Sequence, residues 1–101
     1  MSRDFAVPSR MNFSALPGGD LVSVGLHDLA RGIESEEALL VSIGAPRLER
    51  LGVRVASPLQ NPELRLYAQL ATANGAAAHS RYNALIRRLV SFERAAECER
   101  R

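Results

Sequence analysis

The sequence predicts an all-α protein, a small bundle of four to five helices behind a flexible N-terminal arm. The chain has 101 residues, enough for one domain with a single core. Of these residues 47% are hydrophobic, and many are alanine or leucine, which favour helices. Apolar residues also recur at helical spacing along most of the chain. The expected helices span about residues 20–32, 35–44, 46–51, 62–74 and 76–99.

Residues 1–19 mix Ser, Arg and Pro with isolated apolar residues, which predicts a poorly ordered arm before a single helical domain at residues 20–101. Asp20 is the expected N-cap of the first helix. Gly25 lies on the apolar face of this helix and would let another helix approach closely, and Gly32 would end it. The apolar face lies within an arc of about 140° and consists of Val22, Gly25, Leu26, Leu29, Ala30 and Ile33.

The most apolar stretch of the chain is residues 38–44, near its middle. Ser35 is the expected N-cap of a helix through this stretch, and two glutamates follow in the first turn, where they complement the helix dipole. The apolar side chains then point in nearly every direction, which is typical of a buried helix. Gly44 would end it, and Pro46 suits the start of a short helix that ends at Gly52.

Residues 53–62 contain two prolines and form the expected connection to the second half of the chain. The alternation at Val53-Arg54-Val55 resembles a strand, but it has no evident partner. Asn61-Pro62-Glu63 then predicts the start of a helix. The expected inner face of this helix consists of Leu64, Tyr67, Leu70 and Ala71.

The last helix is the longest and has a well-defined apolar face. This face lies within about 120° and consists of Ala78, Tyr82, Leu85, Ile86, Leu89, Phe92 and Ala96. Glu93 projects onto the same face, where a charge would be costly to bury alone. The helix is about 36 Å long. It therefore spans the whole body or projects beyond it, and a projecting end would suit a homodimer.

The composition also limits the function. A formal net charge of +2 is too small to indicate a nucleic-acid partner by itself. A single cysteine, Cys98, and the lack of an N-terminal apolar run of about seven residues lead us to expect a cytoplasmic protein. No membrane span is expected, because the longest apolar run, residues 38–41, is too short. Two histidines and one cysteine without ligand spacing predict neither a metal site nor a cofactor.

No catalytic residues are expected, and an enzyme is the least favoured class. His27-Asp28 has the composition of a base with its orienting acid, but adjacent residues on a helix point about 100° apart. His27 lies on the polar face and has no identifiable convergent partner. His79 lies at the edge of the apolar face of the long helix, either as a hydrogen-bonded boundary residue or before the helix begins.

The central stretch has two alternative interpretations. A degenerate helix-turn-helix would use residues 35–52, with Gly44 in the turn and Arg47 and Arg50 on the recognition helix. That helix would have only about six residues, which is short for a major groove. A β-loop-α-β unit would instead make residues 39–43 a buried strand beside a phosphate-binding Gly44. Its connection is shorter than the dozen or so residues that a parallel crossover needs.

Six arginines are candidate contacts with a partner: Arg47, Arg50, Arg81, Arg87, Arg88 and Arg94. On the long helix, Arg81 and Arg88 form one column and Arg87 and Arg94 form another. Glutamates are interleaved with them, and this mixed charge favours a solvated helical face over a binding surface. The leading hypothesis is a protein–protein interaction module, with a partner protein or a second copy bound by apolar grooves and the arginine face. The alternative is a nucleic-acid-binding regulator that uses the helix-turn-helix at 35–52 and the arginine-rich helix.

Overall fold

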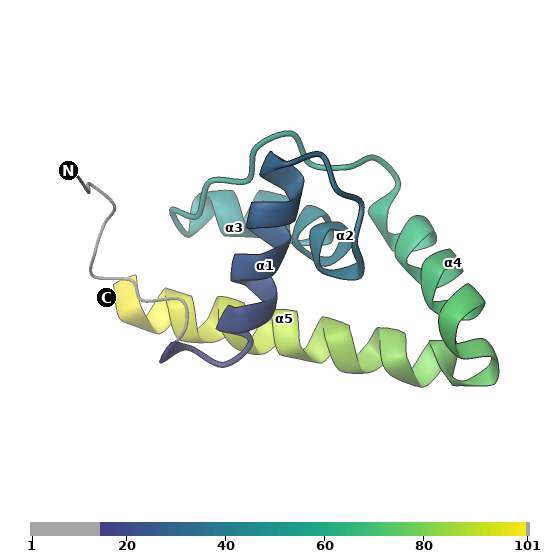
Figure 1. Ribbon diagram of the computed structural model, residues 1–101. Coiled ribbons are helices and arrows are strands. Elements are labelled where there is room, and N and C mark those ends of the chain that lie inside the picture. The colour runs from purple at the N-terminus through teal and green to yellow at the C-terminus, as the bar shows by residue number, and fades with distance from the viewer. Residues whose placement is uncertain (1–14, 101) are drawn as a thin grey trace.

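The structure, a computed structural model, describes residues 15–100, with the side chains up to Glu99. Within this range every regular element is a helix, and the predicted all-α bundle is confirmed (Figure 1). The β-loop-α-β interpretation of residues 39–43 is therefore wrong. The elements are α1 (Gly19–Ala30), α2 (Glu36–Ile43), α3 (Ala45–Arg50), α4 (Pro62–Asn74), the 3-10 turn η2 (Gly75–Ala77) and α5 (Ala78–Arg100). Residues 1–14, most of the predicted arm, lie outside the described range.

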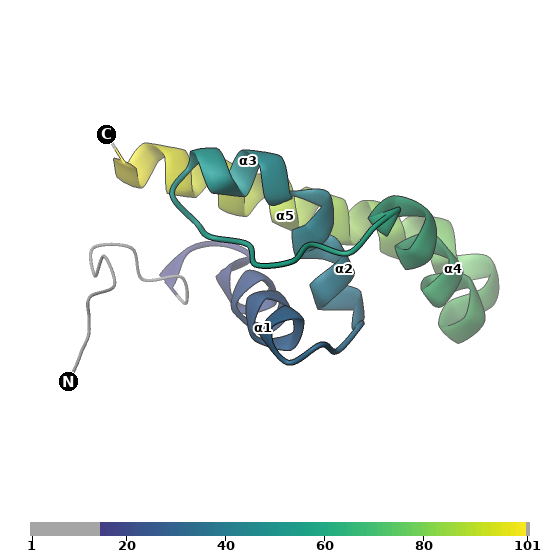
Figure 2. The ribbon, with the colours of Figure 1, turned by 90° about the horizontal axis from the view of Figure 1, so that it is seen from above.

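The long helix α5 forms the base on which the other helices rest. It runs along the long dimension of a body that measures 44 × 27 × 20 Å (Figure 1). Helices α1, α2 and α3 gather over the middle and C-terminal part of α5, and α4 folds back over its N-terminal end (Figures 1 and 2). The α4–α5 hairpin thus forms one end of the molecule.

Helix α2 is the centre of the core, as the sequence predicts. The Ser35 hydroxyl caps it by accepting a hydrogen bond of 3.0 Å from the backbone N–H of Ala38. Residues 38–41 are completely buried, because α1, α4 and α5 pack around this short helix. Gly44 separates α2 from α3, and Pro46 stands in the first turn of α3 as expected.

Helix α1 differs from its prediction at both ends. Its N-cap is Gly18, with φ of 74°, and Asp20 lies inside the first turn, where its carboxylate bonds to Arg88 instead of capping. The helix ends at Ala30, which is exposed like Ile33, so neither residue belongs to the packed face. Gly25 has the predicted role. A Cβ there would collide with the carbonyl oxygen of Glu37 on α2.

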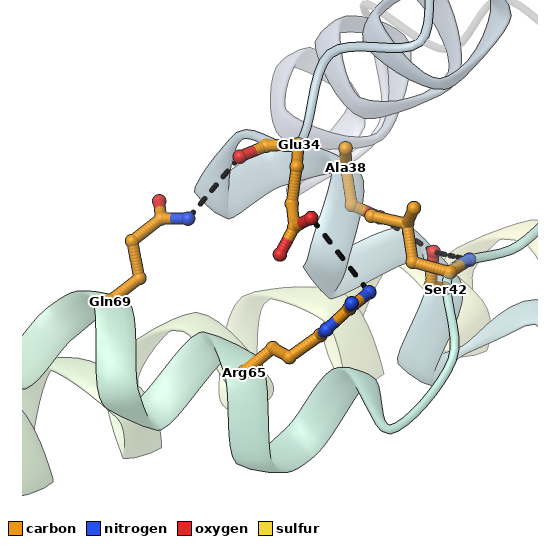
Figure 3. Close-up of polar contacts among 6 residues, drawn as sticks. Glu34, Ala38, Ser42, Arg65 and Gln69 are labelled. Carbon is orange, nitrogen blue, oxygen red and sulfur yellow. Dashed lines mark hydrogen bonds and ion pairs between the residues drawn. The ribbon is translucent and has the colours of Figure 1, made fainter.

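An extended strap, residues 53–61, crosses from α3 to α4. Val53 and Val55 are buried and Arg54 is exposed, so the strand-like alternation is real although no strand forms within residues 15–100. Ser42 fixes the strap to α2. Its hydroxyl donates to the carbonyl of Ala38 at 2.8 Å and accepts from the N–H of Leu59 at 2.9 Å (Figure 3). Both partners satisfy a hydroxyl that is almost fully buried.

Helix α4 has the predicted bounds but presents a different face to the core. Its buried residues are Leu66 and Leu70, which pack toward α2. The prediction of Leu64, Tyr67 and Ala71 as inner residues is wrong, because all three are exposed. The sequence offers two apolar stripes that share Leu70, and the packing against α2 selects the one that contains Leu66. Asn61 occupies the N-cap position, with φ of 49°, but its side chain makes no capping hydrogen bond.

Most of the predicted inner face of α5 is confirmed. Ala78, Leu85, Leu89, Phe92 and Ala96 are buried, and Tyr82 and Ile86 are partly buried at the edge. Glu93 is buried with them, at 6% exposure. The carboxylate is therefore enclosed within the bundle together with the apolar side chains of this face.

Candidate protein-binding surface

One side of α4 is apolar and faces solvent. Leu64, Tyr67, Ala68 and Ala71 follow one another at the i, i+3, i+4 and i+7 spacing of a helix stripe, and all four are exposed. Leu64 is 74% exposed and Tyr67 is 39% exposed. We call these four residues the α4 apolar face. Single exposed apolar residues are common, whereas a large one within a continuous stripe is typical of a surface that binds something.

Aromatic rings extend this face onto α5. The centroid of the Tyr67 ring lies 5.6 Å from that of Tyr82 and 6.3 Å from that of His79, and both pairs are tilted. The pKa of Tyr82 is raised above its ordinary value of 10.0, mainly by burial and to a smaller extent by the nearby Glu63 carboxylate. The Tyr82 phenol is therefore uncharged at neutral pH. The rings make the edge of the face an aromatic surface.

The orientation of α4 is fixed by contacts on its other sides. Besides the buried leucines, two polar side chains reach the residue that precedes the cap of α2 (Figure 3). The Gln69 amide donates to the backbone carbonyl of Glu34 at 3.2 Å, and the Arg65 guanidinium lies 3.7 Å from the Glu34 carboxylate. These contacts hold the α4 apolar face away from the body.

Three of the six candidate arginines join α5 to its neighbours in the bundle. Arg88 bonds to Asp20 of α1 at 3.0 Å, and Arg81 lies 3.7 Å from the carboxylate of Glu36 on α2. From α3, the guanidinium of Arg47 bonds to Glu97 of α5 at 2.9 Å. The carboxylates offset much of the local positive potential that a phosphate-binding surface would need.

The other three candidate arginines are exposed. Arg87 and Arg94 lie on the outer side of α5, seven residues apart, and neither forms an ion pair with any residue in the described part of the chain. Arg50 is on α3, away from this outer side. The structure therefore distributes the six arginines over several surfaces and gathers no basic patch from them.

The helix-turn-helix geometry is only partly present. Helix α3 follows α2 after Gly44, but α3 has six residues, Ala45–Arg50, and so is as short as the sequence indicated. Arg47, one of its two long basic side chains, is engaged with Glu97. A recognition helix needs a free surface long enough to lie in the major groove. Helix α3 is short, and one of its two arginines is bonded within the protein.

One open hollow lies between α3 and the strap, lined by Ser42, Ala45, Pro46, Glu49 and Pro58, with a volume of about 350 Å³. Its polar groups are already used within the protein. Glu49 accepts the N–H of Val55 at 2.9 Å, and Ser42 bonds to two backbone groups. A small-molecule site normally has several convergent polar groups free to orient a ligand, whereas here the Ser42 hydroxyl and one oxygen of the Glu49 carboxylate already bond within the protein.

The residues considered for catalysis and metal binding do not converge. Asp28 accepts a hydrogen bond of 2.6 Å from the Ser35 hydroxyl, and His27 is exposed. His79 contacts Tyr67 and bonds to Asn83. Within residues 15–100 no three His, Cys, Asp or Glu side chains are close enough to hold a metal ion. No helix in the same range is long and apolar enough to cross a membrane.

The sequence did not reveal the α4 apolar face as a surface, because its stripe has the periodicity of a core face. Leu66 and Leu70, which are also one helical turn apart, form a second apolar stripe, and this stripe is the feature of the sequence that could have identified the other one as exposed. Comparison with known proteins gives no match for this chain, whether with protein families, curated sequences or solved structures.

Proposed function

We propose that the protein is a small non-enzymatic interaction module that binds a partner protein through the α4 apolar face. The observation that carries this proposal is the 74% exposure of Leu64 within a continuous apolar stripe. Burying a leucine side chain against a partner stabilises a complex by about 1.5–3 kcal/mol. Tyr67 adds an aromatic ring, a residue type that is enriched where interfaces concentrate their binding energy.

The shape of the surface suits an apolar helix as the bound element. Residues at the i, i+3, i+4 and i+7 positions of one helix form a ridge against which the apolar stripe of a second helix packs. The rings of Tyr67, Tyr82 and His79 border this ridge on the α5 side. A second copy of the chain carries such a stripe itself, so a homodimer is one form of the proposed complex.

The experiment compares Leu64→Glu with the wild-type chain. Sedimentation over a range of concentrations measures self-association, and quantitative capture of binding proteins from a cell extract measures association with others. We expect the charge at position 64 to abolish whichever association the wild-type chain shows. Circular dichroism checks the fold, which a change at a 74% exposed side chain should leave intact.

Val24→Glu is the matched control, because Val24 is also an exposed apolar residue, at 45%, but lies on α1. This control should associate like the wild type. The proposal fails if the wild-type chain is monomeric and captures nothing, or if both variants lose association equally.

The nucleic-acid hypothesis is the second candidate, and the observation in its favour is the pair of outward arginines, Arg87 and Arg94. Binding through these residues would weaken steeply with salt, because phosphate contacts release counterions. It would also be reduced by the double change of Arg87 and Arg94 to Gln and not by Leu64→Glu. This pattern would replace the protein-binding proposal.

A further inference from the structure

Glu93 is a buried carboxylate in the corner where α2, α3 and α5 meet. Its side chain is 6% exposed. One carboxylate oxygen lies 3.0 Å from the position that a Cβ on Gly44 would occupy, and the side chain of Leu89 lies beside it at 3.1 Å from the same position. No other described residue hydrogen-bonds to this carboxylate. The corner therefore encloses an acidic group to which no residue in the described part of the chain donates a hydrogen bond.

The charged groups around the corner come from two helices. Helix α3 presents Arg47, whose positive charge acts on Glu93. Helix α5 presents Glu97, one turn beyond Glu93, and the guanidinium of Arg47 bonds to it at 2.9 Å. The other charges on α3 are Glu49, which bonds to the strap, and Arg50 at its C-terminal end. Gly44 and Leu89 contribute no charged group.

The protonation state of Glu93 determines how costly it is to bury its carboxyl group in this corner. Burial raises the pKa of Glu93 above its ordinary value, and the attraction of Arg47 acts in the opposite direction. A neutral carboxyl group needs no counter-charge in the corner. An ionised one does, because an isolated buried charge is costly. Arg47 is the cation placed to supply it, and its guanidinium is held at Glu97 through Nη2.

We propose that Arg47, Glu93 and Glu97 form a proton-controlled clasp between α3 and α5. While Glu93 keeps its proton, Arg47 bonds to Glu97, as in the structure. When the proton leaves to solvent, Arg47 moves toward Glu93 and its bond to Glu97 weakens. The end of α5 is then held less firmly to α3. The protonation of one buried side chain thus controls the attachment of the last turns of the longest helix.

The experiment is an NMR titration of the glutamate carboxyl carbons together with the side-chain N–H signal of Arg47. We expect Glu93 to titrate above the ordinary glutamate pKa of 4.5, and the Arg47 signal to move with the midpoint of Glu93. The Glu93→Gln variant, which is close in shape, should remove that movement of the Arg47 signal. A Glu93 midpoint at or below the ordinary value of 4.5, or an Arg47 signal that does not follow the titration of Glu93, overturns the proposal.

Two further variants measure the coupling directly. Glu97→Gln removes the competitor for Arg47, so the pKa of Glu93 should fall. Arg47→Gln removes the cation, so the pKa of Glu93 should rise further. Both side chains are about half-exposed, at 42% for Arg47 and 47% for Glu97, so both variants are expected to fold. If the pKa of Glu93 is unchanged in both variants, the clasp proposal is wrong, even if that pKa is raised in the wild-type protein.

Discussion

Gly25 shows how a single residue sets the distance between two helices. A side chain at this position would meet the carbonyl oxygen of Glu37 and lie 2.7 Å from a methyl carbon of Val41. A backbone carbonyl within α2 cannot move aside without moving the helix. We therefore expect Gly25→Ala to lower the free energy of unfolding by about 1–3 kcal/mol, measured by urea denaturation. At an unhindered helix position the same change would raise it by about 1 kcal/mol.

Gly44→Ala is the comparison for that prediction. Its Cβ would lie 3.0 Å from the end of the Glu93 side chain and 3.1 Å from that of Leu89. Side-chain ends can shift, so we expect a smaller loss of stability than at Gly25. A Gly25→Ala variant as stable as the wild type would show that α1 and α2 are not in close contact there.

Glu93 predicts a dependence of stability on pH. Because the pKa of Glu93 is raised in the folded protein, the native state keeps this proton at pH values where the unfolded chain has lost it. The contribution of Glu93 to the free energy of unfolding is most favourable below its ordinary pKa of 4.5. This contribution is lost as pH rises through the higher pKa that Glu93 has in the folded protein. Urea denaturation across this range should show the wild type losing stability relative to Glu93→Gln. A difference that stays constant with pH would contradict the prediction.

At the scale of elements, the orientation of α4 separates two leucines that are two residues apart. Leu66 is fully buried and Leu64 is 74% exposed. We expect Leu66→Ala to lower the free energy of unfolding by about 2–5 kcal/mol, because it leaves a cavity beside α2. Leu64→Ala should change it by less than about 0.5 kcal/mol. Denaturant unfolding of the monomeric protein measures both, and the reverse order would mean that the other apolar stripe faces the core.

The bounds of the elements were largely predictable from the sequence, because local signals set them. The Ser35 cap, the glycine at position 44 and Asn61-Pro62 each act within a few residues of the chain. The faces were predictable where one apolar stripe dominates, as in α5, or where the helix is apolar all round, as in α2. Helix α4 has two stripes, so only its contact with α2 decides which one is buried.

The candidate site was less predictable, because it depends on contacts between distant parts of the chain. The sequence identifies arginines that can lie on the surface, but their partners are far away. Arg47 and Glu97 are 50 positions apart, and Arg88 and Asp20 are 68 apart. Helical periodicity places Glu93 on an apolar face, but the cation that acts on it, Arg47, lies in the other half of the sequence.

For the whole molecule, ion pairs between elements connect surfaces that apolar packing already holds together. Arg47–Glu97, Arg65–Glu34, Arg81–Glu36 and Arg88–Asp20 all involve partly or largely exposed side chains. Exposed pairs each contribute about 0–1 kcal/mol and are screened by salt. We therefore expect thermal unfolding to change by only a few degrees between about 0.05 M and about 1 M NaCl. A collapse of stability at high salt would show that these pairs hold the bundle together.

The position of α5 in the chain has a consequence for synthesis on the ribosome. Helices α1, α2 and α3 are made first, yet the side chains that close the bottom of their core, Leu89, Phe92 and Ala96, are made late. Until that stretch has left the ribosomal tunnel, α2 has part of its apolar surface uncovered. The nascent chain therefore cannot complete its core progressively as it emerges, and a stalled product that ends before residue 89 would expose the surface that chaperones and proteases recognise.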